Sequence, residues 1–451
     1  MDSTSPGRKL GIAIGIAMLL AIPLFAVYLL IYDRATQSDA ARASIAQGWG
    51  DPQKIAGPLL VIPYRVETPQ SVTQDGKPVV RTTTQWRTLT LAPERLALRT
   101  DIAPERRTRS IYETIVYSAR NQGHATYRLP ADFQRLKIPP ETIAFDRAEI
   151  RFGISDPRGV TPDGAIRIDG RPVAPQPGHG PNSTGGSGFF VPVDARSLTG
   201  AAMTVDFGFT ARGHSRLTLI PRAGETGWTV RSPWPHPSFG GDFLPGRSQV
   251  TASGFTASYG VSNLAIGTTL LSDGDETATA SASGRAAARE EQRAIEIALI
   301  QPVDLYAQIN RAVKYGFLFV GFTFTALLMF DVIGGRAVSA VEYLLTGAAL
   351  ILFFVMLLGF AEVTGFAAAY LIAAGAIVGL LTAYSAAVLG SWRRGSLIAT
   401  LLGGLYAVLY VLLRLEAYSL LIGSVLLFIA LAAVMYLTRN LDWGRTGEPH
   451  R

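Results

Sequence analysis

Hydrophobic residues along this chain gather in six long runs: one run near the start, a long polar stretch, and then five further runs. The first run covers residues 10–32. About twenty-two residues at a rise of ~1.5 Å form a helix of roughly 33 Å, which is long enough to cross the hydrocarbon core of a bilayer. The pattern predicts an α-helical membrane protein with six transmembrane helices in a 1 + 5 arrangement. The later runs occupy residues 315–330, 343–360, 366–389, 397–413 and 417–437.

A cleaved secretory signal is the alternative interpretation of the first run. Such signals have an apolar region of only about 7 to 15 residues, followed by a cleavage site with small residues. Only Ala41 and Ala43 resemble such a site, and they lie well beyond the end of the run. We therefore expect an uncleaved anchor helix.

Arginine and lysine residues in the short loops predict the orientation, because cytoplasmic loops carry an excess of positive charge. One set of helix flanks is strongly basic, whereas the opposite short loops carry only Arg414, close to Glu416. Six helices place both termini on the same side, so we expect both termini in the cytoplasm and the long polar stretch in the periplasm of a Gram-negative cell. The basic flanks contain Arg8, Lys9, Arg336, Arg393, Arg394, Arg439 and Arg445.

Within the polar stretch, apolar and polar residues alternate over short runs, which is typical of strands with one buried face. Two dipeptides, Asp169-Gly170 and Arg212-Gly213, separate such runs and predict hairpin turns. We expect a large β-rich extracytoplasmic domain, an antiparallel sandwich or two stacked sheets. The predicted organisation is a cytoplasmic N-terminus (1–9), an anchor helix (10–32), a β-rich periplasmic domain (33–309), a five-helix transmembrane bundle (310–438) and a cytoplasmic C-terminus (439–451).

The formal net charge of +7 first raises the question of nucleic-acid binding. The excess positive charge lies mainly at the predicted cytoplasmic helix ends, where topology requires it, and the polar stretch is close to balance. We therefore expect no nucleic-acid partner. The chain has no cysteine, which excludes cysteine nucleophiles, thiol redox chemistry and thiolate metal sites.

The most unusual local segment covers residues 233–245, where prolines alternate with other residues and two glycines follow. Prolines hold the backbone extended and glycines permit a turn, so the segment presents its aromatic and polar residues rigidly. We interpret it as a candidate contact segment for a partner. Its candidate contact residues are Trp234, His236, Ser238, Phe239, Asp242 and Phe243.

An enzyme is the alternative for this segment, because His236 and Asp242 are suitable as a general base with its orienting carboxylate, or as metal ligands. A zinc site needs about three protein ligands, and the remaining histidines show no ligand spacing. The chain also lacks nucleophile-elbow, Ser-x-x-Lys, His-Glu-x-x-His and phosphate-loop motifs. The sequence thus predicts no catalytic residue, no cofactor and no metal.

Transport through the helices is a third possibility. Ion pathways need ionisable groups within the spans, whereas the candidate carboxylates Glu342 and Glu362 fall at predicted helix boundaries. We expect the helices to anchor the protein in the lipid bilayer and to permit homo-oligomer formation.

Three segments together resemble the CreD family of bacterial inner-membrane proteins: residues 57–63, residues 234–245 and residues 437–443. The resemblance covers nearly the whole chain, including the 1 + 5 layout. It implies a role in cell-envelope integrity and in stress or β-lactam responses controlled by a two-component system. The resemblance implies no reaction, cofactor or catalytic residue.

The hypothesis from the sequence is a non-enzymatic inner-membrane protein whose periplasmic domain binds an unidentified envelope component. A periplasmic hydrolase or metalloenzyme and a transporter are the alternatives. At the end of the last run, Arg439 and Trp443 are the residue types that anchor a helix end at the membrane interface.

Overall fold

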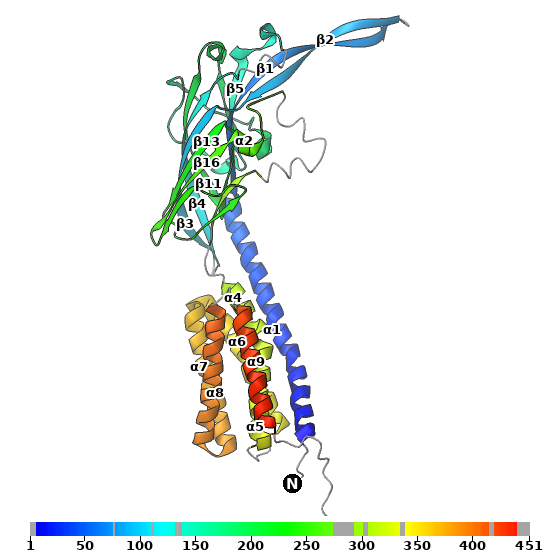
Figure 1. The fold of residues 1–451 in the computed structure, drawn as a ribbon, viewed down its shortest axis with the longest axis vertical. Coiled ribbons are helices and arrows are strands. Elements are labelled where there is room, and N and C mark those ends of the chain that lie inside the picture. The colour runs from blue at the N-terminus through cyan, green and yellow to red at the C-terminus, as the bar shows by residue number, and fades with distance from the viewer. Residues whose placement is uncertain are drawn as a thin grey trace, which may run out of the picture. The chain divides into compact units, whose positions relative to one another are not determined.

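The computed structural model describes residues 6–74, 77–109, 112–130, 133, 138–273, 293–300, 305–333, 339–414 and 419–439. The chain divides into two compact units, and each is described by itself. The helical unit comprises residues 1–40 and 303–451. The sandwich unit comprises residues 41–302 and contains the β-strands (Figure 1).

Long helices form the described part of the helical unit. Four helices are long and apolar enough to cross a membrane: Leu10–Trp49, Ala340–Thr364, Phe366–Ala387 and Gly395–Leu413. The other two predicted spans are also helical, as α5 and α9, but the total of six spans remains a prediction. The helices are α1 (Pro6–Trp49), α4 (Leu305–Lys314), α5 (Gly316–Ile333), α6 (Ala340–Thr364), α7 (Phe366–Leu389), α8 (Trp392–Arg414) and α9 (Ser419–Thr438).

Aromatic side chains hold α6, α7 and α8 together. The ring of Phe353 lies 5.4 Å from that of Tyr370 and 4.6 Å from that of Tyr406. The Tyr370 hydroxyl donates a hydrogen bond of 2.7 Å to the Tyr406 carbonyl oxygen, which satisfies a polar group in apolar surroundings. Gly347 permits close packing of α6 on α1, because a Cβ there would lie 2.0 Å from Leu20.

Two nine-stranded sheets form the sandwich unit. Sheet A has the order β14-β18-β12-β1-β5-β10-β9, with β2 also paired to β1 and β17 paired to β2. Its strands are β1 (Gln53–Gln74), β2 (Lys77–Leu91), β5 (Ala148–Ile154), β9 (Gln176–Pro177), β10 (Gly188–Val193), β12 (Arg216–Ile220), β14 (Pro237–Gly241), β17 (Leu271–Asp273) and β18 (Ile295–Leu299).

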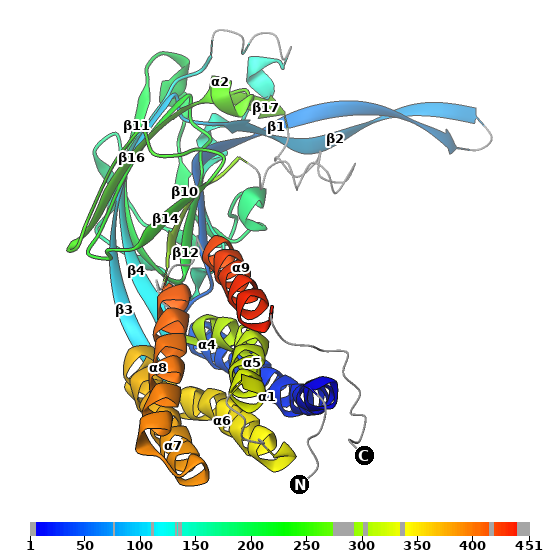
Figure 2. The same cartoon turned by 60° about the horizontal axis from the view of Figure 1, so that its bottom comes forward.

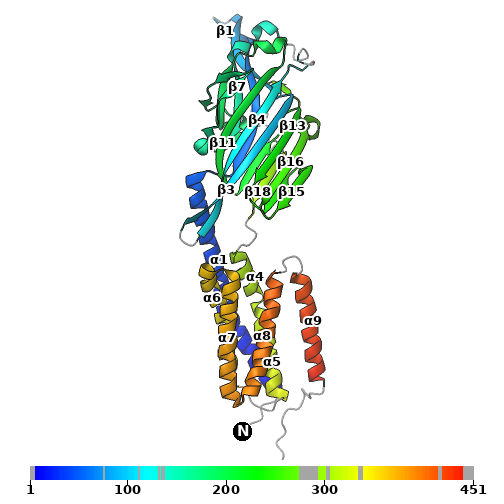
Figure 3. The ribbon, with the colours of Figure 1, turned by 90° about the vertical axis from the view of Figure 1, so that its left-hand side faces the viewer.

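Sheet B has the order β15-β16-β13-β3-β4-β11-β7-β8, with β6 also paired to β11. Figure 3 shows β3, β4, β11, β13 and β16 side by side. The strands are β3 (Arg95–Arg109), β4 (Tyr112–Tyr127), β6 (Thr161–Pro162), β7 (Ile166–Ile168), β8 (Arg171–Val173), β11 (Met203–His214), β13 (Glu225–Ser232), β15 (Arg247–Thr251) and β16 (Gly254–Ser262).

The two sheets are mixed, so the expectation of a purely antiparallel domain was wrong. Strand β12 runs parallel to β1, and β13 runs parallel to β3. Both parallel pairs arise because the chain crosses from sheet B to sheet A after β11 and returns with β13. Alternation shows which face of a strand is buried, but it does not show the direction of the neighbouring strand.

The core lies between the sheets, as the alternation predicted. On β3, Leu96 and Leu98 are buried, whereas Arg95 and Arg99 are exposed. The ring of Phe152 from sheet A lies 5.0 Å from that of Phe207 from sheet B in an edge-on contact. The indole of fully buried Trp228 donates a hydrogen bond of 2.8 Å to the Thr100 hydroxyl.

One of the two predicted turns is confirmed. Asp169 and Gly170, with φ of 48° and 79°, connect the antiparallel strands β7 and β8. The prediction of a turn at Arg212-Gly213 was wrong, because β11 continues through both residues and the chain turns only at Ser215. A second hairpin, formed by β1 and β2, extends beyond its sheet (Figure 2).

Candidate functional site

The predicted contact segment contains a whole edge strand, β14, rather than forming an exposed aromatic surface. Strand β14 pairs with β18 at the edge of sheet A. The Trp234 ring is buried, and its indole donates a hydrogen bond of 3.0 Å to the Ile300 carbonyl oxygen. Phe239 and Phe243 are half-buried and pack against the core. Ser238 is also half-buried. Because the aromatic side chains of this segment pack against the core, they mainly stabilise the edge strand.

His236 and Asp242 are both exposed, but they lie at opposite ends of β14. The carbonyl oxygen of His236 accepts from the Ile300 amide, and the amide of Asp242 donates to the Ala294 carbonyl oxygen. Six residues along a strand span roughly 20 Å, so the two side chains form neither a base–carboxylate pair nor a shared metal site. Among the described residues, no group of three or more His, Cys, Asp or Glu is placed to hold a metal ion.

The two carboxylates considered for transport have local partners in the helical unit. Glu342 forms a capping box with Ser339 at the start of α6, in which each side chain accepts from the other residue's backbone amide. Glu362 accepts a hydrogen bond of 3.1 Å from the Tyr306 hydroxyl. Both contacts stabilise helix packing or helix ends, and transport remains untested.

One of the two predicted interface anchors, Arg439, directly follows α9. The Arg439 guanidinium lies over the Tyr436 ring, 4.1 Å from its centroid. Trp443 lies outside the residues that the structure describes.

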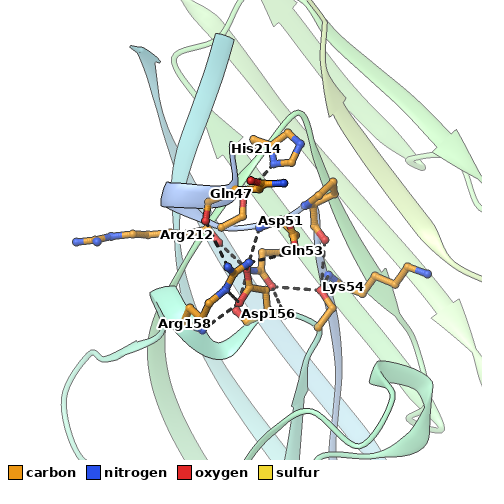
Figure 4. Close-up of polar contacts among 11 residues, drawn as sticks. Gln47, Asp51, Gln53, Lys54, Asp156, Arg158, Arg212 and His214 are labelled. Atoms are coloured by element: carbon orange, nitrogen blue, oxygen red, sulfur yellow. Dashed lines mark hydrogen bonds and ion pairs between the residues drawn. The ribbon is translucent and has the colours of Figure 1, made fainter. Parts of the chain in front are cut away.

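A buried polar network fixes the last turns of α1, residues 41–49, within the sandwich unit (Figure 4). Its centre is Asp156, which is 5% exposed and precedes the short 3-10 helix η4 (Pro157–Gly159). The Asp156 carboxylate accepts from the Asp51 amide (3.0 Å) and from the Arg158 guanidinium (2.6 and 2.8 Å). Arg158 in turn donates to the carbonyl oxygen of Gln47 at 3.3 Å.

Gln53 connects this network to sheet B. The side-chain amide nitrogen of Gln53 donates to the backbone carbonyl oxygens of Asp156 (2.9 Å) and Arg212 (2.6 Å). The Trp49 ring lies between two guanidinium groups, those of Arg107 (4.6 Å) and Arg212 (4.8 Å). The Trp49 indole donates to a backbone oxygen of β4, that of Tyr117, at 3.1 Å. The end of α1 is thereby held by strands that are distant in sequence.

The electrostatics of this network indicate a structural role. Hydrogen bonds from Arg158 lower the pKa of Asp156 to about 2, although desolvation acts in the opposite direction. Burial raises the pKa of Tyr117, whose hydroxyl donates to the Arg216 carbonyl oxygen at 2.6 Å. Asp156 therefore stays ionised and Tyr117 stays protonated at neutral pH. Our sequence patterns did not single out this network, although Asp51-Pro52 and Asp156-Pro157 are visible turn signals.

The outward face of sheet B contains a groove of about 790 Å³, which we call the polar groove. Small residues of four adjacent strands line it: Gly227 (β13), Ala97 (β3), Gly123 (β4) and Gly208 (β11). Polar side chains surround them. The polar residues of the lining are Arg99, Gln122, His124, Asp163, Arg167, Asp206, Thr229 and Arg231.

At two of the glycines in the lining, close neighbouring atoms leave no space for a side chain. A Cβ on Gly123 would lie 2.2 Å from the Phe207 ring, and one on Gly208 would lie 2.3 Å from the Asp163 carbonyl oxygen. Gly227 is different, because a Cβ there would meet only a backbone oxygen of Leu96 at 3.8 Å. The open surface at Gly227 is therefore available to a ligand.

The carboxylates of the polar groove have partners among neighbouring side chains. The imidazole of His124 lies 2.7 Å from an oxygen of Asp206. Arg120 forms a two-pronged ion pair with Asp163, which lowers the pKa of that carboxyl group. The groove thus presents fixed charges and hydrogen-bonding groups on a rigid sheet, an arrangement suited to recognising a polar ligand.

Comparisons with known proteins agree with this architecture. The family model described as inner membrane protein CreD matches residues 5–444. The chain is 31% identical to the inner membrane protein CreD of Escherichia coli strain K12 over 437 residues, covering 95% of this chain and 92% of that protein. The apolar helices agree with a place in the inner membrane. The chain therefore belongs to the CreD family of inner membrane proteins.

Proposed function

We propose that this protein is a non-enzymatic, six-span inner-membrane protein whose sandwich unit lies in the periplasm and binds another component of the cell envelope through the polar groove. Both termini lie in the cytoplasm. Binding through this surface supports envelope integrity or the response to envelope stress. The polar groove, an open recess on a domain carried by membrane helices, is the observation that carries this proposal.

The chemistry of the groove favours binding over catalysis. Its polar groups come from adjacent strands of one sheet, and those strands are fixed by continuous backbone pairing. A rigid sheet preserves the spacing of these groups, which favours recognition of an extended polar ligand. The hydrolase alternative requires the side chains of His236 and Asp242 to act together. The two residues lie at opposite ends of β14, which is too far apart for that role.

The binding surface extends toward the segment that the sequence singled out. Arg231 lines the polar groove and also a second hollow of about 600 Å³. That hollow reaches Pro233, the first residue of the predicted contact segment. A partner bound along this face would therefore contact the groove and the start of that segment together.

Photocrosslinking in whole cells tests the proposal. A photoreactive amino acid at Gln122, which is exposed in the groove, is expected to capture an envelope component. The matched position is Gly260, which faces outward on neighbouring β16, does not line the groove and has open space around its Cβ. Capture at Gln122 well above Gly260 supports the proposal. Equal background capture at both positions contradicts it.

The absence of cysteine permits a clean test of the proposed topology. Single cysteines would be introduced at Ser391, between α7 and α8, and at Thr364, at the end of α6. A membrane-impermeant thiol reagent added to spheroplasts is expected to label position 364 but to label position 391 only after lysis. The reverse labelling would overturn the proposed orientation.

A further inference from the structure

A second, apolar recess lies between the two sheets, lined by residues of β6, β7 and β11 from sheet B and of β9 and β10 from sheet A. Its volume is about 210 Å³, and Gly208 lines both recesses. We call it the apolar pocket. It is lined mainly by prolines, aromatic rings and branched side chains, among them Val160, Pro162, Ile166, Pro177, Phe189 and Phe209.

The local strand pairing explains why Gly208 lines both recesses. Strand β6 and strand β7 both pair with β11, at Phe209 and at Val205 respectively. Gly208 lies between these pairings, and its carbonyl oxygen accepts from the Asp163 amide at 3.1 Å. Its missing side chain lets the chain around Asp163 approach β11 closely. The connection from β6 to β7 therefore has the polar groove and the apolar pocket on its two sides.

An exposed guanidinium group, that of Arg167, lies beside this connection and lines the polar groove. Arg167 on β7 lies next to Asp206 on β11 in the sheet register, and Asp206 is already paired with His124. Arg167 donates only to a backbone oxygen, that of Gly170, at 3.3 Å. Within the described part of the chain, neither Arg167 nor Arg231 forms an ion pair with a carboxylate. Guanidinium groups of this kind bind phosphate or carboxylate groups through two parallel hydrogen bonds.

We propose that the polar groove and the apolar pocket form one site for an anionic amphiphile. The anionic head binds at Arg167, the polar groove accommodates the remainder of the head, and the apolar pocket holds a short part of the hydrocarbon chain. The pocket volume corresponds to about seven water molecules, so it accommodates only a few methylene groups. This inference rests on the proposed function and assigns its ligand class.

The test uses full-length protein held in amphipol. The probe is a lysophosphatidylglycerol with a photoreactive diazirine at the end of its acyl chain. After irradiation, mass spectrometry is expected to find the label within residues 157–177 and 188–209, the two segments that contain the lining of the apolar pocket. Label confined to the helices would overturn the proposal.

Two variants test the apolar pocket and the Arg167 charge separately. Val160→Trp fills the apolar pocket and should abolish this labelling, since Val160 is half-buried in the lining. Arg167→Gln removes the charge and should weaken labelling roughly tenfold or more, as expected for one charge-assisted contact. The matched control is Arg171→Gln on adjacent β8, an exposed residue outside both linings. Unchanged labelling in both site variants, or an equal loss in the control, would contradict the proposal.

Competition identifies the chemistry of the ligand. Unlabelled lysophosphatidylglycerol should compete at least tenfold better than lysophosphatidylcholine or glycerol phosphate. Equal competition by the zwitterionic lipid would refute the anionic head, and equal competition by glycerol phosphate would refute the apolar chain. If position 122 still captures a protein in cells while the lipid probe fails, the amphiphile inference falls and the proposed binding function stands.

Discussion

The substitution Asp156→Asn tests whether the buried network fixes residues 41–49, the last turns of α1, within the sandwich unit. Asparagine keeps the size of the side chain but removes the charge that Arg158 neutralises. The Asp156 carboxylate is almost completely buried, but the Arg158 side chain is 59% exposed, so solvent screens part of their interaction. Lowering the pKa from 3.8 to about 2 therefore sets an upper limit of roughly 2 kcal/mol, since each factor of ten in proton affinity is about 1.4 kcal/mol.

The sign follows from the direction of the pKa change. The folded protein holds Asp156 ionised more strongly than the unfolded chain does, so the stabilisation is present above the unfolded pKa of 3.8. It is lost as the pH falls through about 2. The difference between wild type and Asp156→Asn should therefore be full at pH 7 and should shrink between about pH 5 and pH 2.

Hydrogen exchange on the full-length protein measures this effect locally. Amides near Asp51 and Gln53 should exchange faster in the variant at pH 7, by up to roughly thirty-fold, which corresponds to the upper limit of about 2 kcal/mol. Asp194→Asn is the matched control, because Arg196 also lowers the pKa of Asp194 to about 2 although that pair lies exposed on the surface. The control should show no measurable change. Unchanged exchange in Asp156→Asn, or an equal effect in both variants, would refute the reasoning.

Three further variants distinguish structural from functional residues. Tyr117→Phe should cost about 1 to 2 kcal/mol in denaturant unfolding, because it leaves buried hydrogen-bonding groups unpaired. Trp234→Phe should destabilise the edge strand by about 1 kcal/mol by removing the bond to Ile300, detected as faster exchange of the β14 amides. His236→Ala combined with Asp242→Asn should leave envelope permeability unchanged in complemented cells, and loss of function at normal expression would restore the enzyme alternative.

Local sequence patterns predicted much of the fold. The length of the apolar runs predicted helices, because spanning a bilayer sets a minimum length. Alternation predicted the buried face of β3, and Asp169-Gly170 predicted its turn because both residues tolerate positive φ. These features depend on residues that are close together in sequence.

Features that depend on distant residues were not predicted. Gln53 meets Arg212 across 159 positions of sequence, so no local pattern connects them. The polar groove likewise combines outward residues of four strands whose order depends on the parallel pairing of β13 with β3. Trp234 was interpreted as a contact residue because its proline-rich surroundings are unusual. Its burial results from packing against the core, which the surrounding sequence does not reveal.

Filling the polar groove tests the central claim most directly. Gly227→Phe places a ring on the groove floor, where the backbone offers no clash, and Gly260→Phe places the same ring on its cross-strand neighbour outside the lining. Envelope permeability would be measured in cells that lack the native protein and carry either variant at equal membrane levels. We expect Gly227→Phe to fail to restore the barrier, whereas Gly260→Phe should restore it. Full restoration by Gly227→Phe would contradict a binding role for the groove.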